Sequence, residues 1–154
     1  MLLKGPKTNS EVQDINTRVI YGTENVINAE IDLFNRSKKK VDSCMAFSRP
    51  PLAISLPQIK KAFSDAQGRG IELRYITEIT FDNLPYCKEL LDIVGELRHL
   101  DGVKNNFMIS EGEYLAPLIV DEKRVIASEV VYSNVAQVIE QGQYIFDTLW
   151  SKAI

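Results

Sequence analysis

The sequence predicts an α/β (mixed α+β) fold, in which a mixed sheet has parallel core strands, C-terminal hairpins and helices on both faces. Strand-like and helix-like segments alternate up to about residue 97, which is the pattern of a parallel sheet with crossover helices. Short apolar runs separated by polar turns follow, as in antiparallel hairpins. A chain of 154 residues with 45% hydrophobic content can bury one core without disulfides or metals.

The first two predicted strands lie at 18–22 and 41–47. Gly22 ends the first strand, and Thr23 is the predicted N-cap of a helix over 24–36. The second strand is buried, and Arg49-Pro50-Pro51 stops it because proline cannot donate to a ladder. The lysine run 38–40 is interpreted as a solvated helix end in preference to a binding patch.

The clearest helix lies in the middle of the chain. Gly68 and Gly70 end it, because glycine adopts the left-handed conformation that commonly follows a helix. The segment 71–78 is the second core strand, and Pro85 fits the first turn of a third helix. The apolar residues of these two helices recur at spacings of three and four: Ile59, Ala62, Phe63 and Ala66, then Tyr86, Leu90, Val94 and Leu97.

Hairpins and a final helix are predicted for the rest of the chain. Glu111-Gly112 is the turn of a hairpin over 106–115, and the polar run 121–124 is a second turn between 118–120 and 125–127. Residues 1–16 are predicted to be a flexible N-terminal arm, and 17–154 the folded domain. The C-terminal helix, capped by Ser133 or Asn134, has one apolar face: Val135, Val138, Ile139, Gly142, Phe146 and Leu149.

Charge and composition argue against several classes of partner. A net charge of −3 and a pI near 5.3 disfavour nucleic acid, which requires a basic face. No apolar run approaches the roughly 20 residues that span a bilayer, and Leu2-Leu3 is too short an apolar region to predict a signal peptide. Cys44 and Cys87 are far apart and fit two reduced thiols, so we expect a cytoplasmic protein. Cys44 is expected to be a small buried hydrophobe.

The spacing of residues along the sequence matches none of the common catalytic or metal-binding motifs. No glycine-rich loop opens a helix, and no nucleophile-elbow sequence surrounds a serine. His99 is the single histidine, and one histidine with two scattered cysteines is poor material for a zinc site. We therefore expect no catalytic residues, no metal and no cofactor in this module.

Four segments together resemble the input domains found N-terminal to archaeal sensor histidine kinases: 72–80, 86–90, 96–104 and 144–153. The resemblance implies a non-catalytic sensory domain of a two-component system that binds an unknown small ligand or protein partner. It also implies a homodimer whose C-terminal helix runs on toward a downstream kinase region. Tyr144, Phe146 and Trp150 are then expected to be core or dimer contacts.

The order of segments also resembles one half of a phospholipase D-like domain, a fold shared with effector domains of some archaeal regulators. In that family a histidine is the nucleophile, a lysine holds the phosphate and an aspartate orients the imidazole. The best alignment places Lys104, Asn106 and Glu111 at these positions, with Ala127-Ser128 where the family has glycine-serine. The resemblance thus implies a retained fold without phosphodiesterase chemistry. A phospholipase D-like phosphodiesterase or nuclease, and the effector-binding domain of a transcription regulator, remain alternatives.

A ligand site is predicted beyond the carboxyl ends of the two core strands, where open parallel sheets bind ligands. Arg74 and Glu78 are charged residues of an otherwise apolar strand, so each needs a partner. For Arg74 the alternative is an ion pair with a neighbouring carboxylate such as Glu78 or Glu72, or contact with water. For His99 the alternatives are a structural hydrogen bond or a pH response. The predicted ligand-binding residues are Ser48, Arg49, Arg74, Thr77, Glu78 and His99.

Overall fold

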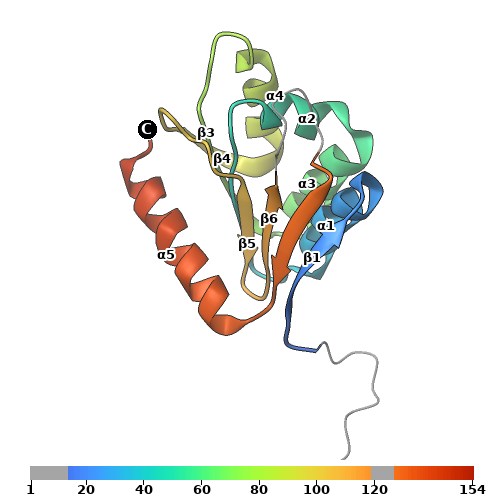
Figure 1. Cartoon of the computed structure of the whole chain (residues 1–154). Helices are drawn as coiled ribbons and strands as arrows, with labels where there is room; N and C mark the ends of the chain where they lie inside the picture. Colours follow the sequence, from blue (N-terminus) through green and yellow to red (C-terminus); the bar gives the residue numbers. More distant parts are fainter. Residues whose placement is uncertain (1–13, 119–126) are drawn as a thin grey trace, which may run out of the picture.

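A computed structural model describes residues 14–118 and 127–154 of the chain. Its strands form one seven-stranded sheet in the order β1-β7-β6-β5-β2-β3-β4. Helices α1 to α4 cover one face of the sheet and α5 lies along the other (Figure 1). The elements are β1 Thr17–Tyr21, α1 Thr23–Arg36, β2 Lys40–Cys44, α2 Arg49–Ser55, α3 Pro57–Gly68, β3 Glu72–Thr77, α4 Leu84–Val94, β4 Gly95–His99, β5 Phe107–Ser110, β6 Tyr114–Leu118, β7 Glu129–Ser133 and α5 Ala136–Lys152. The predicted mixed sheet with helices on both faces is confirmed.

The parallel half of the sheet has one strand more than the sequence predicted. Strands β2 and β3 pair in parallel as expected, and β4 pairs in parallel with β3. The expected third helix included Leu97, but α4 ends at Val94 because Gly95 takes a φ of +86° that stops the helix. Leu97 therefore lies on β4, opposite Tyr75 of β3.

The two prolines after β2 begin a helix that the sequence analysis missed. Pro50 and Pro51 stand in the first turn of α2, where a backbone N–H has no intrahelical partner to lose. The strand itself stops earlier than predicted, at Cys44. A second correction concerns α1: Thr23 is inside the helix, and Gly22 precedes it without a side-chain cap.

The antiparallel half confirms the predicted hairpin over 106–115. Strands β5 and β6 pair antiparallel, and β6 continues to β7 and β7 to β1 in the same manner. The second predicted turn, 121–124, lies outside the described residues. The strand that pairs with β6 is 129–133, a segment to which the sequence analysis assigned no strand.

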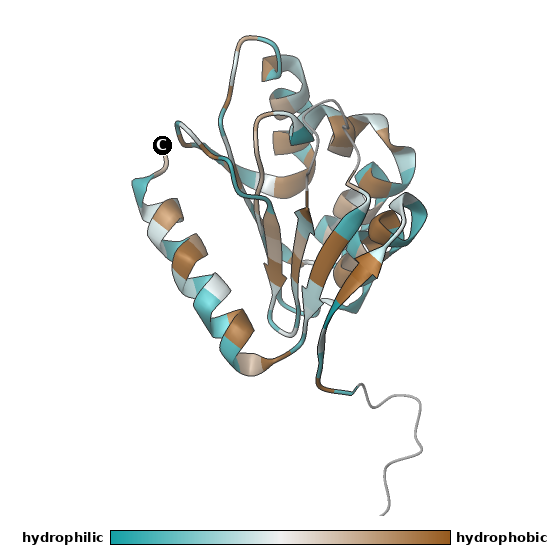
Figure 2. Cartoon of the chain, viewed as in Figure 1, coloured by the Kyte–Doolittle hydropathy of each residue, from teal (hydrophilic) through white to brown (hydrophobic). Residues whose placement is uncertain are grey.

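The sheet separates two apolar clusters of unequal size. The larger cluster lies under α1 to α4, and the smaller one joins α5 to β2, β3 and β5. The hydropathy of α5 alternates along the helix, as expected for a helix with one buried side (Figure 2). Gly142 allows α5 to approach closely, since a Cβ there would meet a Tyr114 ring carbon at 2.9 Å and an Ile109 methyl at 3.0 Å.

Most of the predicted N-terminal arm lies outside the described residues. Its last residues, 14–16, lie against the start of α5, where Asn134 Oδ1 accepts the N–H of Asn16 at 2.7 Å and Asn134 Nδ2 donates to Asp14 O. The division into an arm over 1–16 and a domain over 17–154 stays a prediction. Within 14–118 and 127–154, no helix combines the length and the apolar content that a membrane span requires.

Candidate functional site

The structure distributes the predicted ligand residues over both faces of the sheet. Arg49, the first residue of α2, lies among the helices on one face. Arg74 points to the opposite face, where it contacts α5. The two arginines therefore do not share one site, because the sheet lies between them.

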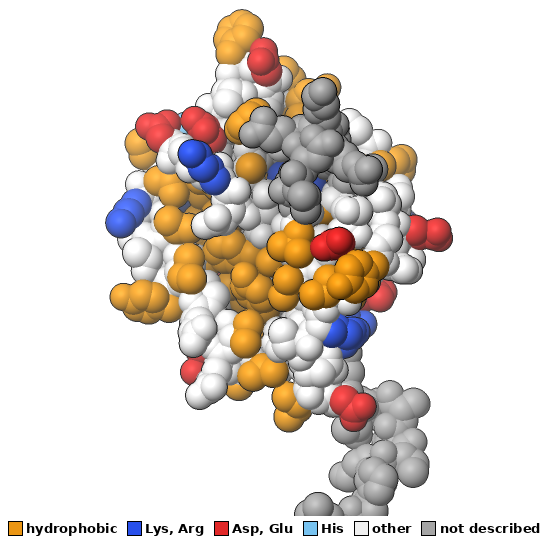
Figure 3. Space-filling model, in the orientation of Figure 1, with side chains coloured by type: hydrophobic (Ala, Val, Ile, Leu, Met, Phe, Trp, Pro, Cys, Tyr) orange, Lys and Arg blue, Asp and Glu red, His pale blue; other side chains and the backbone are white. Residues whose placement is uncertain are grey.

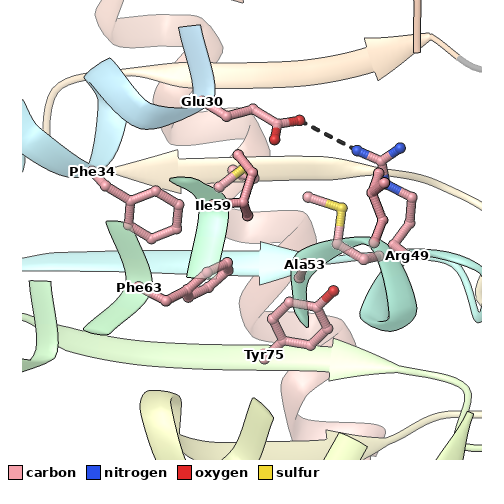
Figure 4. A pocket seen from close by; sticks show the side chains of 10 residues that line it. Glu30, Phe34, Arg49, Ala53, Ile59, Phe63 and Tyr75 are labelled. Atoms are coloured by element: carbon pink, nitrogen blue, oxygen red, sulfur yellow. Dashed lines mark hydrogen bonds and ion pairs between the residues drawn. The ribbon is translucent and has the colours of Figure 1, made fainter. Parts of the chain in front are cut away.

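Arg49 enters a narrow chamber between the helical layer and the sheet (Figure 4). Its Nη2 lies 3.3 Å from Oε1 of Glu30, and both side chains are buried. Burial raises the pKa of Glu30, although the Arg49 charge acts in the opposite direction. The chamber has a volume of about 30 Å³, which is room for about two water molecules and too little for a metabolite.

Arg74 is the centre of a polar network that holds α5 against the sheet. Its guanidinium donates to both oxygens of Asp42 at 2.8 Å, and Nη2 lies 3.3 Å from Asp147 on α5. The same guanidinium lies 5.0 and 5.2 Å from the ring centroids of Phe146 and Trp150. The alternative of a neighbouring carboxylate partner is confirmed, but the partners are Asp42 and Asp147 in place of Glu72 or Glu78. Of these, Asp42 lies on the neighbouring strand.

Asp42 is completely buried and fully hydrogen-bonded. Besides Arg74, Lys40 Nζ donates to Asp42 Oδ2 at 2.9 Å and Gln143 Nε2 donates to it at 2.9 Å. Burial alone would raise the pKa of Asp42, but the hydrogen bonds from Arg74, Gln143 and Lys40 outweigh it and lower the pKa. The network therefore keeps a buried carboxylate ionised and ties β2, β3 and α5 together.

His99 is a structural residue of the β4 end. Its Nδ1 accepts the N–H of Ile79 at 2.9 Å, and Nε2 lies 2.7 Å from an oxygen of Asp101. Because Nδ1 accepts, the neutral imidazole carries its hydrogen on Nε2, which donates to the Asp101 carboxylate. With both nitrogens engaged, the imidazole has no lone pair directed at a substrate.

Asn83 bridges the loops where a ligand was expected. Its Nδ2 donates to the carbonyls of Phe47 and Glu78, each at 2.9 Å, and its Oδ1 accepts the N–H of Thr80. Thr77 is fully buried, and its Oγ1 has no hydrogen-bond partner among the described residues. The sequence analysis did not single out Asn83 as a bridging residue. None of the cavities described in this section contains all six predicted ligand residues. Their role in ligand binding stays a prediction.

A groove does lie at the positions where the phospholipase D resemblance places the nucleophile and the phosphate ligand. It runs between α5 and the β5–β6 hairpin and has a volume of about 500 Å³. Lys104 is exposed at its rim, while Asn106 Oδ1 accepts the N–H of Ala46 and so fixes the loop after β2. The lining residues are Lys104, Asn105, Asn106, Phe107, Tyr114, Ala116, Pro117, Leu118, Gly142 and Ile145. Imidazole and carboxylate are absent from these lining residues.

Glu111, at the aspartate position of the resemblance, lies at the opposite end of β5 from Asn106. Its carboxylate accepts three successive backbone N–H groups, those of Lys38, Lys39 and Lys40, at 3.1, 2.9 and 3.2 Å. Burial acts to raise the pKa of Glu111, but these backbone donors outweigh it and lower the pKa. Glu111 therefore fastens the β5–β6 turn to the turn after α1, and it cannot orient a group in the groove.

Glu113 is a further buried carboxylate that the sequence analysis did not single out. Arg36 donates to both of its oxygens, with a shortest distance of 2.8 Å, and the Tyr132 hydroxyl donates to it at 2.5 Å. Burial and the bond to Glu113 raise the pKa of Tyr132 to about 12. The sequence signal for Asp42 was an acidic residue inside an apolar strand. For Glu113 it was an acidic residue beside a tight turn.

Comparison with known proteins identifies the fold and no closer relationship. No protein-family model and no curated protein matches the sequence. Among solved structures, the chain is similar to the phospholipase D family member Nuc of Salmonella typhimurium (TM-score 0.71, 14% identity, 92% of this chain and 97% of that one). It is similar also to NucT of Helicobacter pylori (TM-score 0.73, 10% identity, 92% and 99%). The chain therefore has a phospholipase D-like fold.

A third similar structure comes from a longer protein. TrmBL2, described as an archaeal chromatin protein with a novel mode of DNA binding, has a TM-score of 0.69 and 17% identity. The similarity covers 96% of this chain and 56% of that one, so the chain spans about half the length of TrmBL2.

The role of Glu111 can be tested through its pH dependence. Because its pKa is lower in the folded state, Glu111 stabilises the fold above its unfolded pKa of about 4.3 and loses this effect as the pH falls through the folded value. Glu111→Gln should lower the free energy of unfolding by about 1 kcal/mol at pH 7. The difference from the parent should shrink below about pH 4. Urea denaturation at several pH values measures it, and the exposed Glu72→Gln is the control. A difference that is the same at pH 3 and pH 7 would refute this role.

Proposed function

We propose that this chain is a non-catalytic regulatory module of phospholipase D-like fold, which binds a partner through the face that carries the former catalytic groove. The observation that carries the proposal is the groove itself. The positions that the resemblance gives to nucleophile and phosphate ligand hold Lys104 and Asn106, and the remaining lining is mostly apolar. An ammonium cannot replace the imidazole nucleophile, and a neutral amide supplies no charge for a phosphate.

The enzyme class is the second candidate, and the similarity to Nuc and NucT supports it. A phosphodiesterase would need a nucleophile beside an anion-binding group. Within the part of the chain that the structure describes, no cluster of three histidine, cysteine or acidic side chains could hold a metal ion. His99, the single histidine, is fixed by Ile79 and Asp101 and does not line the groove. Residue chemistry thus favours the regulatory proposal, whereas fold similarity favours the enzyme.

A further question is whether this module belongs to a histidine kinase or to a transcription regulator. A place in a histidine kinase, which the sequence resemblance implied, draws no support from the similar structures. The similarity to about half of TrmBL2 is in keeping with a module of a longer regulator, the transcription-regulator alternative. The proposal therefore covers regulation by binding and leaves DNA contact to other domains, given the net charge of −3.

An assay of phosphodiester hydrolysis separates the two candidates. The regulatory proposal predicts that the chain hydrolyses bis(4-nitrophenyl) phosphate no faster than buffer does, with or without magnesium, manganese or zinc. The physical reason is that the described residues lining the groove offer no imidazole nucleophile beside a phosphate-binding charge. Turnover that disappears in Lys104→Ala or His99→Ala, but persists in the exposed Lys88→Ala, would establish the enzyme instead.

The partner that we propose is a second copy of the chain. Val19 lies opposite Val131, and Val131 lies opposite Ala116, so these side chains form one row across β1, β7 and β6. Ala116 lines the groove beside α5, which places the row on the α5 side of the sheet. Figure 3 shows apolar side chains gathered on this face between α5 and β1.

Several large apolar side chains on this face are exposed. Val19, Tyr21, Tyr144 and Ile145 have exposed fractions of 39, 64, 75 and 48%. A contiguous apolar patch on one face commonly marks an interaction site. Only α5 covers this side of the sheet among the described helices, so β1 and β7 have no helical cover there. A second copy would supply the missing layer.

Charges at the two ends of the face fit a twofold arrangement. Lys104 lies at the end of the groove near the start of β5, and Glu140 lies one turn into α5 at the other end. Both are exposed, and neither pairs with a charged side chain among the described residues. A twofold partner with reversed strand direction brings Lys104 near Glu140 of the partner subunit, and the reciprocal pair forms by symmetry.

A charge exchange tests this arrangement. Lys104→Glu and Glu140→Lys should each weaken dimerisation about tenfold, because each places like charges together twice in the dimer. The double variant should restore it, and Ile145→Asp should abolish it. Light scattering after size exclusion measures the mass against the 17.4 kDa chain. A monomeric parent chain, or a double variant no tighter than the single ones, would contradict the proposed interface.

A further inference from the structure

The groove between α5 and the β5–β6 hairpin has a polar end and a longer apolar body. Lys104, Asn105 and Asn106 form the polar end, directly before β5 begins, and the rest of the lining is mostly apolar. Its volume of about 500 Å³ is that of a small-molecule site. A cavity with a few polar groups at one end suits a ligand with a polar head and an apolar body.

The polar end carries one positive charge. Lys104 is the single charged residue of the lining, it is exposed, and no carboxylate of the described residues forms an ion pair with it. Beside it, Asn106 Oδ1 accepts the N–H of Ala46, so that amide offers its Nδ2 hydrogens to a ligand. An ammonium next to an amide donor favours an anion, because charge-assisted hydrogen bonds are stronger than neutral ones. One unit of positive charge matches a monoanion.

The apolar body of the groove follows strand β6. Tyr114, Ala116 and Leu118 share one face of the strand, because side chains alternate with a period of two, and all three line the groove. At a rise of about 3.4 Å per residue, this row is about 14 Å long. It begins with Leu118 at the polar end and runs to Tyr114, with Gly142 and Ile145 of α5 on the opposite wall. The shape is that of a linear apolar chain.

We propose that the groove binds an aliphatic monocarboxylate, whose carboxylate lies at Lys104 and whose alkyl chain lies along β6 toward Tyr114. Removal of the methylene groups from water supplies most of the affinity. The ammonium and the Asn106 amide select the sign of the charge and fix the direction in which the chain lies.

The ligand controls dimer formation, a part of the inference that rests on the proposed function. In the proposed dimer, Lys104 lies near Glu140 of the partner subunit, and the groove faces the second copy. A bound carboxylate takes the place of that glutamate, and its alkyl chain fills the space beside α5. Ligand and second copy therefore exclude each other, and by linkage the ligand shifts the equilibrium toward monomers.

Calorimetric titration of the chain with octanoate, decanoate and dodecanoate, each below its aggregation concentration, tests the site. We expect the affinity to rise at least about threefold at each step, because each step buries further methylene groups. Lys104→Ala should weaken decanoate binding about fivefold and leave the binding of neutral decanol unchanged. Lys88→Ala, at an exposed lysine outside the groove, should change neither. No binding of decanoate, equal affinities for the three chain lengths, or equal losses in the two lysine variants would overturn the proposal.

A variant in the apolar body separates binding in the groove from adsorption elsewhere. Ala116 is small and partly exposed, so Ala116→Phe should fill the groove while the chain still folds. It should abolish the binding of decanoate and of decanol alike, and its melting temperature reports whether it is folded. Unaltered decanoate binding by the folded variant would overturn the site. If the variant fails to fold, the comparison of Lys104→Ala with Lys88→Ala decides alone.

The regulatory part has a separate readout. At ten times its Kd, decanoate should raise the dimer dissociation constant about a hundredfold, because both protomers must release their ligand before they pair. Light scattering with and without decanoate measures this shift. A dimer that decanoate leaves unchanged would refute the regulation. A parent chain that is monomeric throughout would remove the proposed dimer and its regulation, whereas calorimetry decides the ligand site independently.

Discussion

The architecture depends on one buried carboxylate. Asp42 on β2 is completely buried and binds Arg74 on β3, Lys40 on its own strand and Gln143 on α5. An isolated buried charge would cost several kcal/mol, so this position tolerates aspartate only while its partners are in place. The same contacts orient Arg74 toward α5. Helix α5 is thus fixed to the sheet through a polar network as well as through Phe146 and Trp150.

The contacts that stabilise the fold and the proposed partner-binding groove use largely different residues. The residues that hold the sheet and the turns together, Asp42, Glu111 and Glu113, lie away from the groove that contains Lys104 and Asn106. Substitution of the exposed Lys104 therefore leaves these ionic contacts intact. In our proposal, the groove and the apolar row from β1 to β6 form the surface that binds a partner.

The sequence predicted those elements whose signal is local. Helix α3 followed from its apolar spacing, and the β5–β6 hairpin followed from Glu111-Gly112 between two apolar runs. Strand β4 was missed because Leu97 continues the helical spacing of α4, and only the positive φ of Gly95 separates the two elements. The partner of Arg74 could not be predicted, because the pairing of Asp42 with Arg74 depends on the register between two strands. The sequence placed all predicted ligand residues near the carboxyl edge of the core strands. In the structure, however, the sheet separates Arg49 from Arg74.

The most direct test of this account is a double-mutant cycle on Asp42 and Arg74, read out by the free energy of unfolding. Arg74→Gln should cost about 3–5 kcal/mol, because it leaves the buried carboxylate without its main partner. Adding Asp42→Asn should recover part of that loss, since no lone charge then remains buried. Amide exchange in α5 should accelerate in Arg74→Gln more than in α3. A loss below about 1 kcal/mol, or strictly additive effects of the two substitutions, would contradict the central role of this ion pair.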